Sequence, residues 1–170
     1  MGRVHAANTS LNGISNAGKI VGQAESLGKW KGFAYDGVTL TDVIVSCDKC
    51  QSTIAYGINQ WGDVVGSYFT GDRDWGFVMI NGGPVAISPA DAVNSVATGI
   101  NAQDQIVGTY TDGHLVVHGF LDVSGSFSLI DVPQGGRRVP STSITGLNDQ
   151  GRITGNYLDN HDRSTDSFSM

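Results

Sequence analysis

The sequence predicts an all-β protein: a small four-bladed β-propeller built from four copies of one four-stranded antiparallel sheet. A motif of glycines and aliphatic residues recurs at a spacing of about 44 residues, which is the size of one propeller blade. No segment sustains a helical period, whereas short strand-like segments alternate with turn formers throughout. We therefore expect one domain over residues 1–170 and almost no helix.

Each copy of the repeat opens with a segment like Gly-Ile-Asn and later reaches a Gly-Phe step. The opening glycines are Gly13, Gly57, Gly99 and Gly146. The later step recurs as Gly32-Phe33, Gly76-Phe77, Gly119-Phe120 and, altered, Ser167-Phe168. The units defined in this way span about residues 11–54, 55–96, 97–143, and 144–170 together with 1–10.

The elements of one unit follow from this order. The Gly-Ile-Asn segment predicts the first strand, and the Asn-x-x-Gly after it suits a type I turn that ends in a residue with positive φ. Gly18, Gly62 and Gly151 hold that last position, and Asp104, which tolerates positive φ, replaces them in the third unit. Ile-Val-Gly-x-Tyr predicts the second strand, the Gly-Phe segment the third, and a segment such as 84–87 the fourth.

Packing and closure can also be anticipated. The inner strands of a small ring crowd together, so the glycine columns that begin at Gly13 and Gly22 should lie where backbones approach. The aliphatic columns that begin at Ile14 and Ile20 should pack between blades. The last unit stops in its third strand, and we hypothesise that Arg3 to Ala7 supplies the missing outer strand and closes the ring.

Composition excludes several classes of function. Ten Lys and Arg stand against 16 Asp and Glu, giving a net charge of -6. A general binder of nucleic-acid phosphates or of anionic membranes needs a basic face, so we expect neither partner. No apolar run approaches the length of a transmembrane helix. Residues 1–10 lack the apolar stretch of a signal peptide, which fits a cytoplasmic chain or a mature secreted one.

The combination of Gly-Ile-Asn, Asn-x-x-Gly, Ile-Val-Gly-x-Tyr and x-Gly-Phe resembles the bacterial HAF family of probable extracellular repeats. The family takes its name from a His-Ala-Phe-like triplet, to which His118-Gly119-Phe120 comes closest. The resemblance covers essentially the whole chain and implies an exported bacterial protein, extracellular or periplasmic. It implies no established chemistry, so no catalytic residue is carried over from it.

Candidate binding residues gather in the loops between second and third strands, which differ most between units. In a propeller the repeated positions build the scaffold and the variable loops carry function. By repeat symmetry these loops should emerge on one face, where the Trp side chains could stack on sugar rings or instead pack on their own blades. The candidates are Trp30, Lys31, Asp72, Arg73, Asp74, Trp75, Asp112, His114, His118, His161, Asp162 and Asp166. Lys31, Trp75, His118 and Asp166 should occupy equivalent places around the ring.

An enzyme is the alternative. His118 or His161 could act as a general base and Asp74 or Asp162 as an acid or orienting group. The spacing of these residues indicates no mechanism, and the motifs of common hydrolases and phosphate-binding loops are absent from the sequence. We therefore leave catalysis open and favour binding.

Cys47 and Cys50 allow three interpretations. The pair is half of a zinc site, a redox motif, or a disulfide in the connection between the first two units, and export permits the disulfide, which we favour. We expect no metal site among the side chains and no cofactor, although carbonyls around the axis of a small propeller could hold a cation. The predicted function is a binding module for a carbohydrate or another surface ligand, monomeric or weakly oligomeric, with a small hydrolase or lyase as the alternative.

Overall fold

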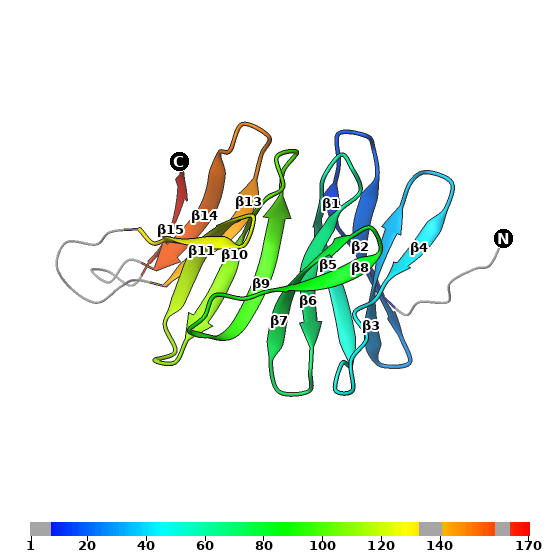
Figure 1. Cartoon of the computed structure of the whole chain (residues 1–170), viewed down its shortest axis with the longest axis horizontal. Helices are drawn as coiled ribbons and strands as arrows, with labels where there is room; N and C mark the ends of the chain where they lie inside the picture. The colour runs from blue at the N-terminus through cyan, green and yellow to red at the C-terminus, as the bar shows by residue number, and fades with distance from the viewer. Residues whose placement is uncertain (1–7, 133–140, 159–163) are drawn as a thin grey trace.

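The protein is a four-bladed β-propeller (Figure 1). The computed structural model describes residues 8–132, 141–158 and 164–170, and within these ranges it contains strands and no helix. Four antiparallel sheets follow one another in chain order, which confirms the predicted fold class. No helix in the described part of the chain is long and apolar enough to cross a membrane.

Each blade begins two to five residues before the predicted unit, at residues 9, 52, 92 and 142. The first blade contains β1 (Thr9–Ile14), β2 (Ile20–Ser26), β3 (Lys29–Tyr35) and β4 (Leu40–Val43). The second contains β5 (Ser52–Ile58), β6 (Val64–Phe69), β7 (Asp74–Ile80) and β8 (Gly83–Ile87). The third contains β9 (Ala92–Ile100), β10 (Gln105–Asp112), β11 (Val117–Val123) and β12 (Ser126–Ile130). The fourth contains β13 (Thr142–Leu147), β14 (Ile153–Leu158) and β15 (Thr165–Ser169).

The turn between first and second strands has the predicted form. Gly18, Gly62, Asp104 and Gly151 all have positive φ, at 76°, 99°, 58° and 77°. The Asn that opens the turn stabilises it, because the Asn59 Oδ1 atom accepts hydrogen bonds from the backbone N–H groups of residues 61, 62 and 63. Asn59 and the equivalent Asn101 are both buried within these turns.

Apolar side chains fill the space between successive blades. Val21 and Val43 of the first blade pack with Ala55, Ile58 and Phe77 of the second, and equivalent clusters join the second blade to the third and the third to the fourth. The aliphatic columns therefore pack between blades as predicted at three junctions. The first blade differs, because Ile14 is 70% exposed there.

The two glycine columns, which begin at Gly13 and Gly22, each lack room for a side chain, but different neighbours take up that room. A Cβ atom on Gly57 would lie 3.3 Å from the Gly99 Cα atom of the next blade, which is the predicted close approach of inner strands. A Cβ atom on Gly108 would instead collide with the Val96 carbonyl oxygen of its own blade. The register of first and second strands shifts beside these glycines in every blade, so the second column marks a bulge inside the sheet.

Closure of the ring is only partly described. The fourth sheet has three strands in the described residues, and the segment proposed to complete it, Arg3 to Ala7, lies outside them. The turns of the first and fourth blades meet, because the Asn16 Nδ2 atom donates a hydrogen bond of 2.7 Å to the Asp149 Oδ2 atom.

Candidate functional site

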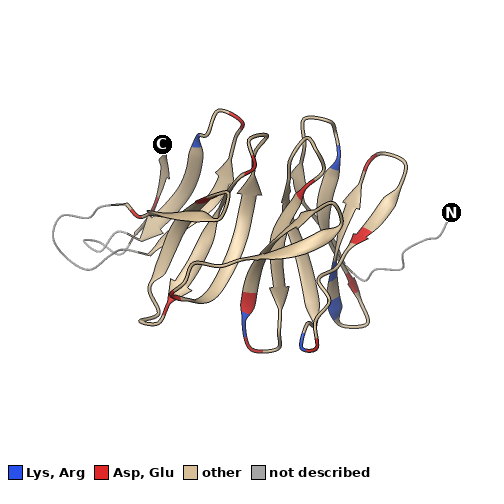
Figure 2. Cartoon of the chain, in the orientation of Figure 1, with Lys and Arg blue, Asp and Glu red and all other residues tan. Residues whose placement is uncertain are grey.

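The loops between second and third strands lie at one end of the propeller, together with connections between blades (Figure 1). The described loops are 27–28, 70–73 and 113–116. We call this end the loop face, and the opposite end, which holds the turns at 15–18, 59–62, 101–104 and 148–151, the turn face. Many of the charged residues lie on the ribbon near these two ends (Figure 2). The three described loops therefore emerge together, as the repeat predicted.

One register position carries a different group in each blade. His118 pairs with Tyr110 across the second and third strands, Trp75 with Tyr68, and Asp166 with Tyr157. Lys31 holds the same position in the first blade, opposite Ala24. The four residues are thus equivalent, as predicted, and three of them stand opposite a tyrosine. The framework repeats while the chemistry at this position changes.

The third blade builds the most ordered group of polar side chains on the loop face. The His118 Nδ1 atom lies 2.7 Å from the Asp131 Oδ2 atom, and the Nε2 atom lies 3.5 Å from the Asp112 Oδ2 atom. The imidazole is buried and stacks on the Tyr110 ring at a centroid distance of 5.1 Å. Asp112 also caps its own loop by accepting hydrogen bonds from the backbone N–H groups of His114 and Val116. The network thus ties the loop, a strand and the connection to the fourth blade together.

The electrostatics of this network favour a protonated imidazole. Burial alone lowers the pKa of His118, but hydrogen bonds and charge from Asp131 and Asp112 outweigh burial and raise it above its ordinary value of 6.5. Hydrogen bonds from the Val116 and His114 N–H groups lower the pKa of Asp112. Burial, with the charges of Asp91, Asp131 and Asp112, raises the pKa of Tyr110. The two carboxylates beside the buried imidazole therefore favour its protonated form over the neutral one.

A small cleft lies beside the network. It has a volume of about 220 Å³ and is lined by Asp91, Tyr110, Phe120 and Phe127, among others. The Phe120 and Phe127 rings meet edge to face, with centroids 5.6 Å apart. An aromatic wall with one exposed carboxylate can hold a flat or hydroxyl-rich group.

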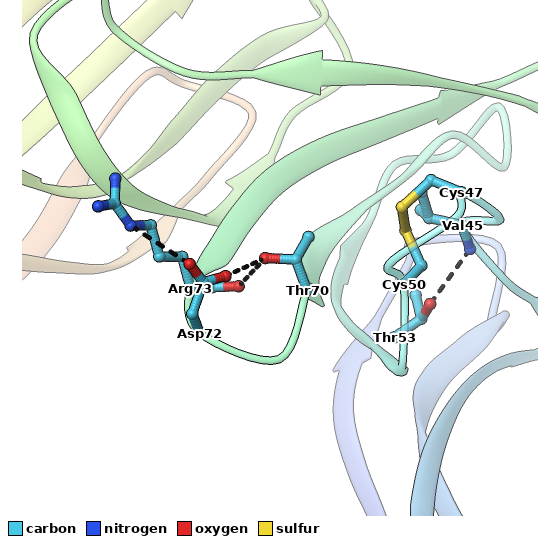
Figure 3. Close-up of a disulfide and its surroundings, with 7 residues drawn as sticks. All are labelled: Val45, Cys47, Cys50, Thr53, Thr70, Asp72 and Arg73. Carbon is cyan, nitrogen blue, oxygen red and sulfur yellow. Dashed lines mark hydrogen bonds and ion pairs between the residues drawn. A yellow bond between two sulfur atoms is a disulfide. The ribbon is translucent and has the colours of Figure 1, made fainter.

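In the second blade the loop is polar and open. The Thr70 Oγ1 atom donates a hydrogen bond of 2.9 Å to the Asp72 Oδ1 atom, and the Arg73 Nε atom lies 3.9 Å from the Asp72 Oδ2 atom (Figure 3). Both charged side chains are mostly exposed. Burial raises the pKa of Asp74, which begins β7 next to the half-buried Trp75.

In the first blade Trp30 borders a cleft of about 180 Å³ whose other wall is the connection to the second blade. The backbone N–H of Trp30 donates a hydrogen bond of 3.2 Å to the Ser52 Oγ atom. The indole of Trp30 is half-buried. Cys47 and Cys50 form a disulfide in that connection, with Cα atoms 5.0 Å apart (Figure 3). The cross-linked loop is further anchored by a buried hydrogen bond of 3.1 Å from the Val45 N–H to the Thr53 Oγ1 atom.

The predicted candidates are thus partly brought together. Asp112 with His118, and Asp72 with Arg73, are in contact, and Trp30 and Lys31 line one cleft. His114 and Asp166 are exposed. His161 and Asp162 lie outside the described residues. The candidates surround the end of the propeller and do not converge on a single pocket.

Sequence reasoning missed Tyr110 and Asp131. The Ile-Val-Gly-x-Tyr motif contains Tyr110, but the motif by itself indicates only a strand. Asp131 follows the fourth strand of its blade, 13 residues after His118, so nothing local in the sequence linked the two. Asp131 has a second carboxylate oxygen, Oδ1, which is buried without a hydrogen bond in the described structure.

The turn face offers less chemistry. A cavity of about 300 Å³ opens there at the axis, surrounded by turn residues of all four blades. Asn59, which lines the cavity, already uses its amide group within its own turn and toward Asp104 of the third blade. The described residues contain no group of three His, Cys, Asp or Glu side chains arranged to hold a metal ion.

Comparison of the sequence with protein-family models found no match, and comparison with curated proteins found none either.

Proposed function

We propose that this chain is an extracellular binding module that recognises a carbohydrate, or a ligand of similar polarity, through its loop face. The observation that carries the proposal is the register position held by Lys31, Trp75, His118 and Asp166. At this position Lys31 and Asp166 are exposed and Trp75 is half-buried, whereas His118 is buried. A constant framework that presents a different group in three of its blades suits recognition of an irregular polar surface. The extracellular location rests on the resemblance to the HAF repeats.

Two tryptophans on this face support a carbohydrate. Trp30 and Trp75 are partly exposed, and each lies near hydrogen-bonding side chains. Sugar rings combine an apolar face with hydroxyl groups, so they match an aromatic surface that polar groups border. The clefts beside Trp30 and Tyr110 have room for single sugar units rather than a deeply enclosed ligand.

A glycan array followed by affinity measurements on the strongest binding oligosaccharide tests the proposal. Trp30→Ala and Trp75→Ala should each weaken binding at least about tenfold, since truncating an aromatic anchor typically costs more than 1 kcal/mol. Trp61→Ala is the matched control, because this indole is 67% exposed on the turn face. Absence of glycan binding, or an equal loss in Trp61→Ala, would contradict the proposal.

The second candidate is a small hydrolase or lyase that uses His118. In its favour, the contact of 2.7 Å with Asp131 is the arrangement by which a carboxylate orients a general base. Against it, the Nε2 atom faces the Asp112 carboxylate, and the raised pKa of His118 favours the protonated ring, which cannot accept a proton. Turnover of an array-identified glycan that His118→Gln abolishes, while binding is retained, would establish this candidate over the first.

A further inference from the structure

A cleft of about 220 Å³ lies between the connection that joins the second blade to the third and the outer strand of the third blade, β12. Its lining includes Asp91 from the connection, Tyr110 and Phe120 from β10 and β11, and Phe127 and Leu129 from β12. Phe127 and Leu129 are 39% and 59% exposed, so the outer wall of the cleft is an accessible apolar surface. A small organic molecule can therefore reach this cleft and pack against that wall.

Tyr110 contributes a polar group that lacks a partner. The residue is only 7% exposed and lines the cleft, and its hydroxyl makes no hydrogen bond to any described residue. Its ring is held in place by stacking on His118. The hydroxyl of a buried tyrosine usually has a hydrogen-bond partner, because an unpaired polar group costs free energy. This hydroxyl is therefore available to a group that enters the cleft.

Negative charge surrounds the same hydroxyl. Burial raises the pKa of Tyr110, and the charges of Asp91, Asp131 and Asp112 raise it further, so all three carboxylates act on one atom. Asp112 and Asp131 contact His118, whereas Asp91 forms no ion pair within the described residues. Even when the imidazole is protonated, three carboxylates face one cation. The site therefore keeps a net negative charge.

The acidic groups are not part of the repeated framework. Strand register places Tyr68 of the second blade where Tyr110 stands in the third, but it places Ser88 where Asp131 stands. The framework thus supplies the tyrosine, and the third blade adds carboxylate groups around it. A group added in one copy of a repeat points to a site rather than to the fold.

We propose that this cleft binds a protonated primary amine carried on an aliphatic or ring-shaped group. The ammonium N–H groups can donate hydrogen bonds to the Tyr110 hydroxyl oxygen and to the Asp91 carboxylate. The carrier can pack on Phe127 and Leu129, and an aromatic ring close to a cation adds further attraction. The site is separate from the proposed carbohydrate site, whose evidence is Trp30 and Trp75.

NMR titration of the isotope-labelled chain with n-butylammonium chloride at pH 7 tests this proposal. Butylammonium should shift the backbone amides of residues 90–92, 110 and 127–129. The alcohol n-butanol has the same carbon chain without the charge, so it should bind at least about tenfold more weakly. Higher salt concentration should weaken the binding of butylammonium, because part of the attraction is between charges.

Two variants with matched controls assign the binding groups. Asp91→Asn removes one exposed carboxylate and should raise the dissociation constant of butylammonium at least about threefold. Asp48→Asn, which changes an exposed carboxylate in the preceding connection between blades, should leave it unchanged. Tyr110→Phe removes only the hydroxyl and should raise the dissociation constant about fivefold, whereas Tyr68→Phe should not. Circular dichroism verifies that each variant keeps the β fold.

Glucosamine and Nα-acetyl-lysine methylamide carry the same ammonium group on a sugar and on an amino-acid side chain. Binding of either supports the site, and the tighter of the two identifies its source. Equal affinities for butylammonium and butanol, wild-type affinity in Asp91→Asn or in Tyr110→Phe, or shifts that avoid the cleft would each overturn the proposal. Butylammonium contains no sugar, so its failure to bind would leave the glycan-array test of the loop face unaffected.

Discussion

At the scale of single residues, the third blade shows how a different residue at one repeat position creates a local network of charged side chains. The position that holds Lys31 or Trp75 in other blades holds His118 here, and carboxylates from two separate segments reach it. The Asp131 Oδ1 atom is buried without a hydrogen bond in the described structure. Removing the positive charge of the neighbouring His118 would therefore leave this carboxylate poorly compensated, which costs free energy. The network stabilises the loop face while the imidazole is protonated.

The pH dependence of stability follows from the raised pKa of His118. A group whose pKa is higher in the folded state stabilises the fold fully below its unfolded value of 6.5, and this contribution is lost as pH rises through the folded pKa. His118→Gln should therefore lower the free energy of unfolding by about 2 kcal/mol at pH 6, with a smaller difference at pH 9. Urea unfolding at several pH values measures this difference. His114→Gln, an exposed histidine of the same loop, should behave as wild type, and an unchanged pH profile in His118→Gln would contradict the assignment.

At the scale of the element, the blade depends on a bulge beside a glycine. In the third blade the first and second strands change register next to Gly108, whose missing side chain leaves room for the Val96 carbonyl and the Phe120 ring. The Phe of the Gly-Phe step is thus packed over a glycine of the neighbouring strand, which explains why the two motifs recur together.

Gly108→Ala tests this packing. The added Cβ atom would collide with backbone, so the substitution should destabilise the fold by about 3 kcal/mol, the upper range for overpacking of a core. Gly113→Ala is the control, because a Cβ atom there meets nothing within 4 Å, and it should change stability little. Chemical denaturation of both variants compares them. Equal stabilities would show that the bulge tolerates a side chain.

The elements themselves were predictable because their signals are local. Asn-x-x-Gly defines a turn from four adjacent residues, and Asp104 could be assigned to a positive φ from its own chemistry. The bulge was not predicted, because it depends on the distance between two strands. The contact between His118 and Asp131 was missed for the same reason, since the pairing of β11 with β12 brings them together.

At the scale of the whole molecule, the repeat predicted the propeller because each unit buries an apolar face only against the next unit. The repeat did not predict that Ile14 would be 70% exposed in the first blade, whereas its counterparts Ile58 and Ile100 are buried between blades. Such a difference depends on packing between segments far apart in the chain.

We propose that the protein recognises its carbohydrate ligand through the loop face, and chemical-shift mapping by NMR tests this proposal most directly. The oligosaccharide that binds best on the array is titrated into the isotope-labelled protein while backbone amides are followed. We predict shift changes concentrated at residues 27–31, 70–75 and 112–118, with the turns at 59–62 and 101–104 unaffected. Changes concentrated at those turns, or no changes at the loops, would contradict the assignment.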